Sequence, residues 1–128
     1  MAKAIRPESL LPLTPAVFQI LLALTDRERH GYGIMQEVAV QTNGLLRLGP
    51  GTLYGCLNRM LRAGIVEESE ERPDPKMDDE RRRYYRITDL GRRVIRLEIR
   101  RLEQAIHAAR IKKLVAVVNA DFIGAVRQ

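Results

Sequence analysis

The sequence predicts a mainly helical α+β domain, and three observations predict it. Three successive segments in the first half of the chain carry hydrophobic residues at the spacing of one helix face. After Gly64 the period changes to that of strands, in two short runs separated by a polar loop that contains proline. A long amphipathic run follows Thr88. The predicted order is therefore three helices, a hairpin and a long helix.

The first two helices have recognisable ends. Thr14 is suited to cap the first helix, and Pro15 suits its first position, where no amide donor is needed. The second helix follows His30 and ends near Asn43-Gly44, where a left-handed residue can stop it. The residues expected to face the core are Val17, Ile20, Leu21, Leu24, Ile34, Met35 and Val38.

The third helix is predicted from about Pro50 to Ala63, and Gly64 supplies a left-handed stop. A small strand is expected just before it, at Leu45–Leu48. At 100° per residue, the helix has one broad apolar arc and an opposite arc that is small, polar or cationic. The apolar arc holds Leu53, Cys56, Leu57, Met60 and Leu61. The polar arc holds Gly51, Thr52, Gly55, Asn58, Arg59 and Arg62, with Tyr54 at the border.

A two-stranded hairpin is predicted after the third helix. Its strands are Ile65–Glu68 and Arg81–Thr88, and a polar loop connects them. Tyr84 and Tyr85 alternate across the second strand, so one of them should pack inward. Three helices followed by a hairpin form the layout of a winged helix-turn-helix domain. In that layout the third helix enters the DNA major groove and the hairpin is the wing beside it.

The last helix, from Asp89 to about Leu114, is predicted to form a dimer contact. We therefore divide the chain into a winged helix-turn-helix domain, residues 1–88, and a dimerisation helix with its tail, residues 89–128. Two apolar stripes run along the helix, and the heptad spacing of one suits a partner helix. The heptad stripe is Ile95, Ile99, Leu102, Ile106 and Ala109, and the stripe expected to dock on the chain's own domain is Leu90, Val94 and Leu97. Packing of both stripes within one chain is the alternative, but a small domain has little spare core for so long a helix.

Gly55 is the informative residue of the third helix. A glycine inside a helix costs about 1 kcal/mol relative to alanine, so it needs a reason such as close approach of another surface. DNA or a neighbouring helix would supply that reason. Asn58 can bond adenine bidentately, Arg59 can bond guanine, and Thr52 and Tyr54 suit phosphates or the thymine methyl. The alternative is an ordinary solvated face, and the winged-helix layout and the basic chain favour DNA contact.

The charge of the chain also favours a polyanionic partner. The formal net charge is +6, and its distribution is uneven. Residues 67–80 hold eight acidic and two basic residues, whereas residues 81–113 hold twelve basic and three acidic ones. A basic surface attracts nucleic acid because neutralising phosphates releases counterions. This argument is weak alone, because many helices carry arginine for solubility.

Several other classes of protein are not supported by the sequence. No apolar run is long enough to cross a membrane, the N-terminus does not read as a signal peptide, and the single Cys56 suggests a reducing cytoplasm. No nucleophile–base pair or phosphate-binding loop is present, so we expect neither an enzyme nor a cofactor. Consecutive acids such as Asp78-Asp79 are common in loops and no histidine joins them, so no metal site is expected.

The wing poses a difficulty, because its predicted loop is acidic and phosphate would repel it. We expect the acids to lie away from DNA or to pair with the arginines at the base of the second strand. For those arginines, contacts with the DNA backbone and a salt-bridged strand base remain equal alternatives. They are Arg81, Arg82 and Arg83.

The sequence resembles the PadR family of bacterial winged-helix transcriptional regulators. Four stretches match in order within residues 13–91: LTPAVFQILLAL, HGYGIMQEV, LGPGTLYGCLNRMLRAGIVEE and DDERRRYYRITDLGRR. Each pattern is modest, but together and correctly spaced they are specific; the helix after Gly91 matches only in character. Many members have proline where this chain has Gly55, so the local geometry of the third helix can differ.

The resemblance implies a homodimeric, ligand- or stress-responsive regulator, usually a repressor, that binds a palindromic operator. Carried onto this chain, it assigns Thr52, Tyr54, Asn58 and Arg59 to the recognition helix and the segment around Arg81–Arg83 to the wing. We therefore predict a sequence-specific repressor that binds double-stranded DNA as a homodimer. Release by a small-molecule effector of unknown identity is a hypothesis. The alternative function is a winged-helix module that binds protein instead of DNA.

Overall fold

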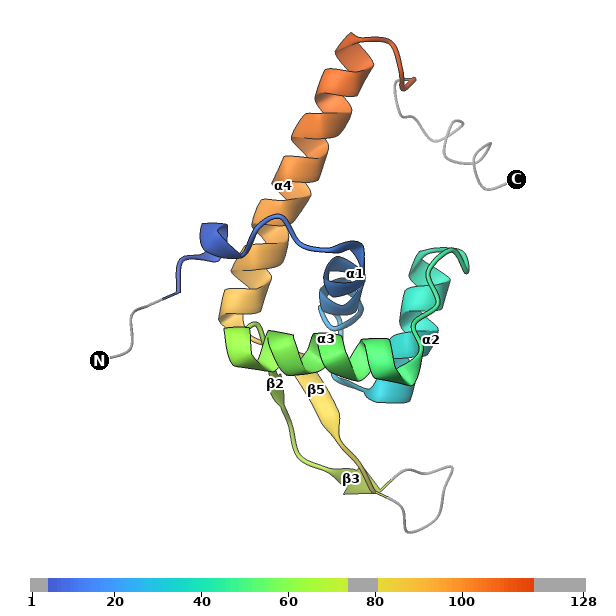
Figure 1. The fold of residues 1–128 in the computed structure, drawn as a ribbon, viewed down its shortest axis with the longest axis vertical. Helices are drawn as coiled ribbons and strands as arrows, with labels where there is room; N and C mark the ends of the chain where they lie inside the picture. Colours follow the sequence, from blue (N-terminus) through green and yellow to red (C-terminus); the bar gives the residue numbers. More distant parts are fainter. Residues whose placement is uncertain (1–4, 74–80, 117–128) are drawn as a thin grey trace. The chain divides into compact units, whose positions relative to one another are not determined.

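The computed structural model of the chain describes residues 5–73 and 81–116. The predicted order is confirmed, since three α-helices precede the hairpin strands and a long helix follows them (Figure 1). The chain divides into two compact units between Glu98 and Ile99, and the first unit contains the winged-helix elements. The acidic loop at 74–80 and the apolar tail at 117–128 lie outside the described residues.

The first helix, α1 (Pro15–Ala23), begins as predicted. The Thr14 hydroxyl accepts a hydrogen bond from the Val17 amide at 3.2 Å, and Pro15 occupies the first helical position. A short 3-10 helix, η1 (Pro7–Leu10), precedes it in a segment to which we assigned no structure. Leu10, Leu11 and Leu13 of this segment pack against the core. The N-terminal segment is therefore part of the folded domain.

The second helix, α2 (Gly31–Gln41), is capped by a histidine side chain. His30 Nδ1 accepts a hydrogen bond from the Gly33 amide at 3.0 Å, so the side chain satisfies one of the free amides of the first turn. The helix ends in a turn in which Asn43 and Gly44 have φ of 51° and 79°. Ile34 and Val38 are fully buried, as expected.

The predicted strand at Leu45–Leu48 is wrong. These residues form an irregular connection, in which the hydroxyl of Thr42 accepts from the Leu46 amide at 3.0 Å. A side chain thus satisfies a backbone amide that a neighbouring strand would otherwise bond. Exposure alternates along the segment, from Leu45, which is 91% exposed, to the buried Leu48, but its residues pair with no strand of the described chain.

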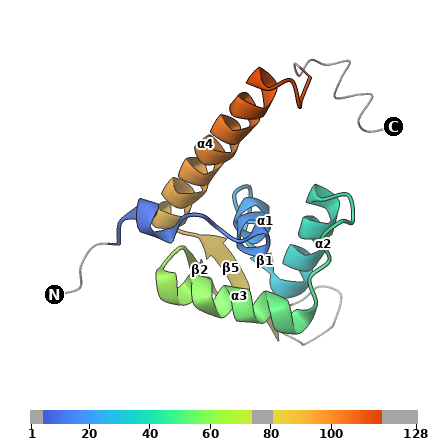
Figure 2. The same ribbon diagram turned by 45° about the horizontal axis from the view of Figure 1, so that its top comes forward.

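The third helix, α3 (Pro50–Ala63), has the predicted bounds. Gly64 ends it with a φ of 77°, the left-handed conformation that glycine adopts at little cost. Leu53, Cys56, Leu57 and Met60 face the core and are at most 2% exposed. Figure 1 shows α2 beside the first turns of α3 and the sheet beside its last turns, and Figure 2 shows the same from another direction.

The wing is built on a three-stranded antiparallel sheet of order β1-β5-β2, comprising β1 (Arg29–His30), β2 (Val66–Glu68) and β5 (Tyr84–Ile87). In the sheet, Val66 pairs with Ile87 and Arg29 pairs with Tyr85. Tyr85 is the inward tyrosine at 4% exposed, and burial raises the pKa of its phenol. Strand β1 was not predicted, because a two-residue strand has no periodicity of its own.

The predicted second strand is interrupted. A separate two-stranded pair joins β3 (Arg72–Pro73) to β4 (Arg81–Arg82), and we call this pair the outer wing. Arg83 lies between β4 and β5, opposite residues 69–71 that separate β2 from β3. The wing therefore has a base on the three-stranded sheet and an outer part beyond a break in both of its strands.

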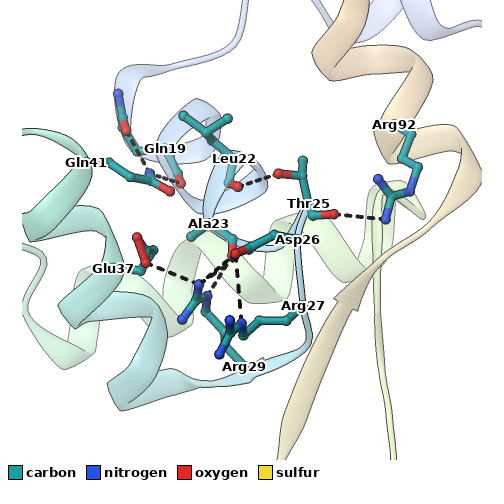
Figure 3. A network of polar contacts seen from close by, with 10 residues as sticks. All are labelled: Gln19, Leu22, Ala23, Thr25, Asp26, Arg27, Arg29, Glu37, Gln41 and Arg92. Atoms are coloured by element: carbon teal, nitrogen blue, oxygen red, sulfur yellow. Dashed lines mark hydrogen bonds and ion pairs between the residues drawn. The ribbon is translucent and has the colours of Figure 1, made fainter.

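A network of polar contacts joins α1, α2 and the first turns of the last helix (Figure 3). Arg29 is at its centre: its Nε donates to the Ala23 carbonyl at 2.7 Å, and its Nη2 pairs with Glu37 at 3.1 Å. Arg92 donates to the Thr25 carbonyl at 3.1 Å, which satisfies a carbonyl at the end of α1. These contacts fix the turn from which β1 begins.

The long helix, α4 (Asp89–Ile111), starts at the predicted cap, since the Thr88 hydroxyl accepts from the Gly91 amide at 3.1 Å. Its first turns pack in the domain core through Val94, as predicted, and through Ile95, which is 3% exposed. The prediction that Ile95 contributes to the dimer contact through the heptad stripe is therefore corrected, because a residue buried in its own domain cannot contact a partner helix. Glu98 is also buried, and its carboxylate accepts from the Leu13 amide at 2.6 Å.

Within the part of the chain that the structure describes, no helix combines the length and hydrophobicity needed to span a bilayer.

Candidate nucleic-acid interface

The outer face of α3 is polar and open to solvent. Thr52, Asn58, Arg59 and Arg62 are all exposed, on the side of the helix opposite the buried leucines. At helical spacing, Asn58 and Arg62 lie one turn apart at the centre of this face, in line with Gly51 and Gly55. Arg62 was placed on this face by its spacing but was given no role, and the structure makes it as accessible as Asn58.

Gly55 has no neighbour in the described chain that requires a small residue. A methyl group added at its Cα would meet only Arg59 Nη1, at 3.9 Å. Gly51 is more open still, with nothing within 4 Å of the same position. Of the two reasons considered for a mid-helix glycine, packing against a helix of the described chain is therefore excluded.

Tyr54 has a structural role that its position at the border did not reveal. Its hydroxyl lies directly over Gly31, where any larger residue would collide with the phenol ring. The side chain is nevertheless 44% exposed. Tyr54 thus connects α3 to the first turn of α2 while part of its side chain stays accessible, and the contact leaves room at position 31 only for glycine unless the phenol moves.

Arg59 lies at the flank of the face. Its Nη2 atom is 3.4 Å from the Sγ atom of Cys56, one turn back along the helix. The same side chain borders a groove of about 190 Å³ that Leu13, Val17 and Met60 also line. In this conformation the Arg59 guanidinium contacts its own helix, whereas Asn58 and Arg62 are exposed at the centre of the face.

Arg82 and Arg83 of the wing are held by an aromatic ring and by acids, respectively. Arg83 pairs with Glu68 at 3.4 Å and with Glu71 at 3.7 Å, so at this position the salt-bridged alternative is the observed one. Arg82 lies over the ring of Tyr32 with its Cζ 5.9 Å from the ring centre. Arg81 contributes its backbone to β4, and its side chain lies outside the described residues.

The second unit contains the other four residues of the heptad stripe that was predicted to contact a partner helix. Ile99, Leu102 and Ile106 are 36%, 37% and 43% exposed, and they lie on one face of α4 with the half-buried Ala109. Apolar side chains at this spacing on a helix surface are typical of a helix–helix contact.

Residues 5–73 and 81–116 contain no group of three or more histidine, cysteine, aspartate or glutamate side chains arranged to hold a metal ion.

Comparison with known proteins identifies the family. The family model described as "Transcriptional regulator PadR-like family" matches residues 20–97, which extend from α1 into α4. The chain belongs to the PadR-like family. It is thus a PadR-like transcriptional regulator with a winged-helix fold, as the resemblance implied.

Individual relatives agree with this assignment. Transcriptional regulator Rv3488 of Mycobacterium tuberculosis is 38% identical over 85 residues, which are 66% of this chain and 73% of that protein. An uncharacterized protein X of Lysinibacillus sphaericus is 33% identical over 73 residues, and the match spans 57% of this chain and 64% of that protein, less than two thirds of its length.

Solved structures of regulators share the fold. A transcriptional regulator from Clostridium thermocellum is 26% identical, with a TM-score of 0.62 over 78% of this chain and 92% of its own. A PadR family regulator from Clostridium difficile is 20% identical, with a TM-score of 0.63 over 76% of this chain and 96% of its own, a likeness in fold alone.

Proposed function

We propose that this PadR-like regulator is a sequence-specific repressor that binds a palindromic operator as a homodimer. Each α3 enters a major groove with its outer face toward the bases, and the wing lies along the adjacent backbone. Two such helices in a dimer would reach successive grooves, roughly 34 Å apart. An effector that changes this spacing would release the DNA.

Gly55 is the observation that carries the proposal. The helix gives up about 1 kcal/mol by having glycine there, and no neighbour in the described chain requires it. The cost is explained if an outside surface approaches the backbone closely at this turn. The exposed Asn58 and Arg62 beside Gly55 supply the hydrogen-bonding groups that read base edges and phosphates.

The first test is binding to DNA from upstream of the protein's own gene, measured by fluorescence anisotropy across a salt series. Selective binding to one fragment, which weakens steeply as salt increases, is the expected result. A folded dimer that binds no fragment at low salt would instead favour the alternative, a module that binds protein. The acidic residues of the wing would favour that alternative, but three of them, Glu67, Glu68 and Glu71, pair with Arg83 or Arg86.

Gly55→Ala is expected to stabilise the protein and to weaken DNA binding at the same time. Alanine removes the helix penalty, so the free energy of unfolding should rise by about 0.5–1 kcal/mol. The added methyl group would stand between the helix and the groove, so operator affinity should fall. Urea unfolding and anisotropy on the same preparation measure both effects. Gly51→Ala is not a neutral control here, because it lies on the same face. A Gly55→Ala variant with unchanged operator affinity would contradict close approach at this turn.

Asn58→Ala should lower affinity for the operator more than affinity for unrelated DNA. A side chain that bonds a base edge contributes about 1–3 kcal/mol of discrimination, whereas a phosphate contact weakens all sequences alike. Gln36→Ala is a matched control, because Gln36 is an exposed amide on α2 outside this face. Competition binding with operator and random duplexes gives the ratio of the two affinities for each variant. An equal loss on both duplexes would remove Asn58 from base recognition.

A further inference from the structure

Glu28 makes contacts across the whole width of the wing base. It lies just before β1, the edge strand that belongs to the body of the domain. Its Oε2 atom accepts a hydrogen bond from the Ser69 hydroxyl at 2.8 Å and forms an ion pair with the Arg72 guanidinium. Ser69 and Arg72 follow β2 on the far side of β5, because the strand order is β1-β5-β2. One carboxylate therefore connects the body of the domain to the outgoing strand of the wing.

The two partners of Glu28 stand on opposite sides of the break in the wing. The Ser69 amide still bonds the Tyr84 carbonyl at 2.8 Å and continues the pairing of the wing base. Arg72 is the first residue of β3 and pairs with Arg82 in the outer wing. Between them, Glu70 and Glu71 belong to no strand. Glu28 thus spans the point at which the regular backbone pairing of the wing stops.

Arg72 is held in place from a second direction. Its guanidinium lies over the ring of Tyr84, with Cζ 4.3 Å from the ring centre. That ring also meets the His30 ring edge-on, with the centroids 5.4 Å apart. Because Tyr85 and Ile87 face the core, Tyr84 and Arg86 project from the other face of the sheet. Glu28, Arg72 and Tyr84 therefore meet on the face of the wing that is turned away from the core.

The electrostatics favour the charged form of Glu28. The hydrogen bond from Ser69 is the main cause, and the positive charges of Arg72 and Arg86 add to it, so that the pKa of the Glu28 carboxyl lies below its ordinary value. The carboxylate is consequently ionised and available to both partners at neutral pH.

We propose that Glu28 is a positioning residue that holds the outer wing, β3–β4, at a fixed angle to the helical core for its contact with DNA. The inference rests on the proposed DNA-binding function for its final step only. The ion pair is partly exposed, so it adds little to global stability. Its effect is local, because it connects the outer wing to the residue that precedes β1 in the body of the domain.

Glu28→Gln tests this role, since the amide keeps the size of the side chain and an acceptor for Ser69 but loses the charge that holds Arg72. Amide hydrogen exchange of peptides covering residues 66–73 and 82–87 should become faster, while exchange in α1 and α3 stays unchanged. Operator affinity should fall about fivefold, within the range of couplings among residues in one ion-pair network. Glu28→Asp, which restores the charge, should recover part of both effects.

Glu8→Gln is the matched control, because it removes the same charge from an exposed carboxylate that pairs only with the neighbouring Arg6 in the described structure. Removing any acid lowers the repulsion between the protein and DNA phosphates, so the operator affinity of Glu28→Gln is compared with that of Glu8→Gln. Arg72→Gln should reproduce the effects of Glu28→Gln. In the double variant, wing exchange should be no faster and operator affinity no lower than in either single variant.

Wing exchange in Glu28→Gln equal to that in Glu8→Gln would overturn the positioning role, and this readout needs no DNA. Faster wing exchange with operator affinity equal to that of Glu8→Gln would overturn its relevance to DNA contact. Failure of the wild-type protein to bind any DNA would reject the proposed function, while the exchange comparison would still decide whether Glu28 holds the wing.

Discussion

Replacing Gly91 with alanine is expected to lower the free energy of unfolding by about 3 kcal/mol, at the upper end of what an overpacked core costs. Gly91 is buried in the first turn of α4, where its Cα lies against the Ile65 carbonyl. An added methyl group would collide with that backbone oxygen and come within 2.7 Å of the Ile87 side chain. A backbone atom cannot rotate away as a side chain can, so α4 would have to shift relative to β2.

The measurement is urea unfolding followed by circular dichroism at a fixed protein concentration, because the stability of a dimer depends on concentration. Gly51→Ala is the matched control, since nothing lies within 4 Å of its added methyl group. It should leave stability unchanged or raise it. Equal midpoints for Gly91→Ala and wild type would show that the contact with Ile65 does not constrain the helix. An insoluble Gly91→Ala protein beside a folded Gly51→Ala protein agrees with the expectation.

Replacing both Leu102 and Ile106 with aspartate is expected to convert the proposed homodimer to monomers and to reduce operator affinity at least a hundredfold. The two side chains are 37% and 43% exposed on one face of α4, next to Ile99 and Ala109. Burial of a charge in an apolar helix contact costs several kcal/mol, which exceeds what a short seam can offset. A monomer engages one half-site at a time and loses the effective concentration that links the two half-sites.

Sedimentation equilibrium gives the association state. Anisotropy on full and half operators shows how much of the affinity depends on binding both half-sites at once. The control is Gln104→Asp, which places one aspartate on the opposite side of α4, in a groove that Arg100 and His107 also line; it is compared with Leu102→Asp alone as well as with the double variant. Its association state should be that of the wild type. A doubly substituted protein that remains dimeric would show that the heptad stripe does not form the dimer contact. An operator affinity that is retained by a true monomer would reject the need for a dimer.

Much of the fold could be predicted because the relevant signals are local. Thr14 and Thr88 are caps whose side chains bond amides three residues ahead, so their role can be read from neighbouring residues alone. Gly64 ends α3 because the required left-handed conformation is a property of one residue. The buried arc of α3 follows from helical spacing, which depends on the chain within a few turns.

The errors have the opposite origin, since each depends on residues distant in the sequence. The segment Leu45–Leu48 contains residues that suit a strand, but no strand lies beside it. The strand β1 exists only because β5 pairs with it across more than fifty positions of sequence. Ile95 fits a heptad as well as Ile99 does, and only the packed domain shows that it is already buried.

The candidate site shows the same division. From the sequence alone, the spacing on α3 determined which residues share its outer face, and the order of elements predicted that this helix is the recognition helix of the winged-helix layout. Only the tertiary structure decided that no close neighbour requires glycine at position 55, that Tyr54 is held over Gly31, and that Glu28 reaches across the sheet to Arg72. Helical periodicity places residues by distance along the chain, whereas contacts between elements depend on how those elements pack, which no single stretch of sequence specifies.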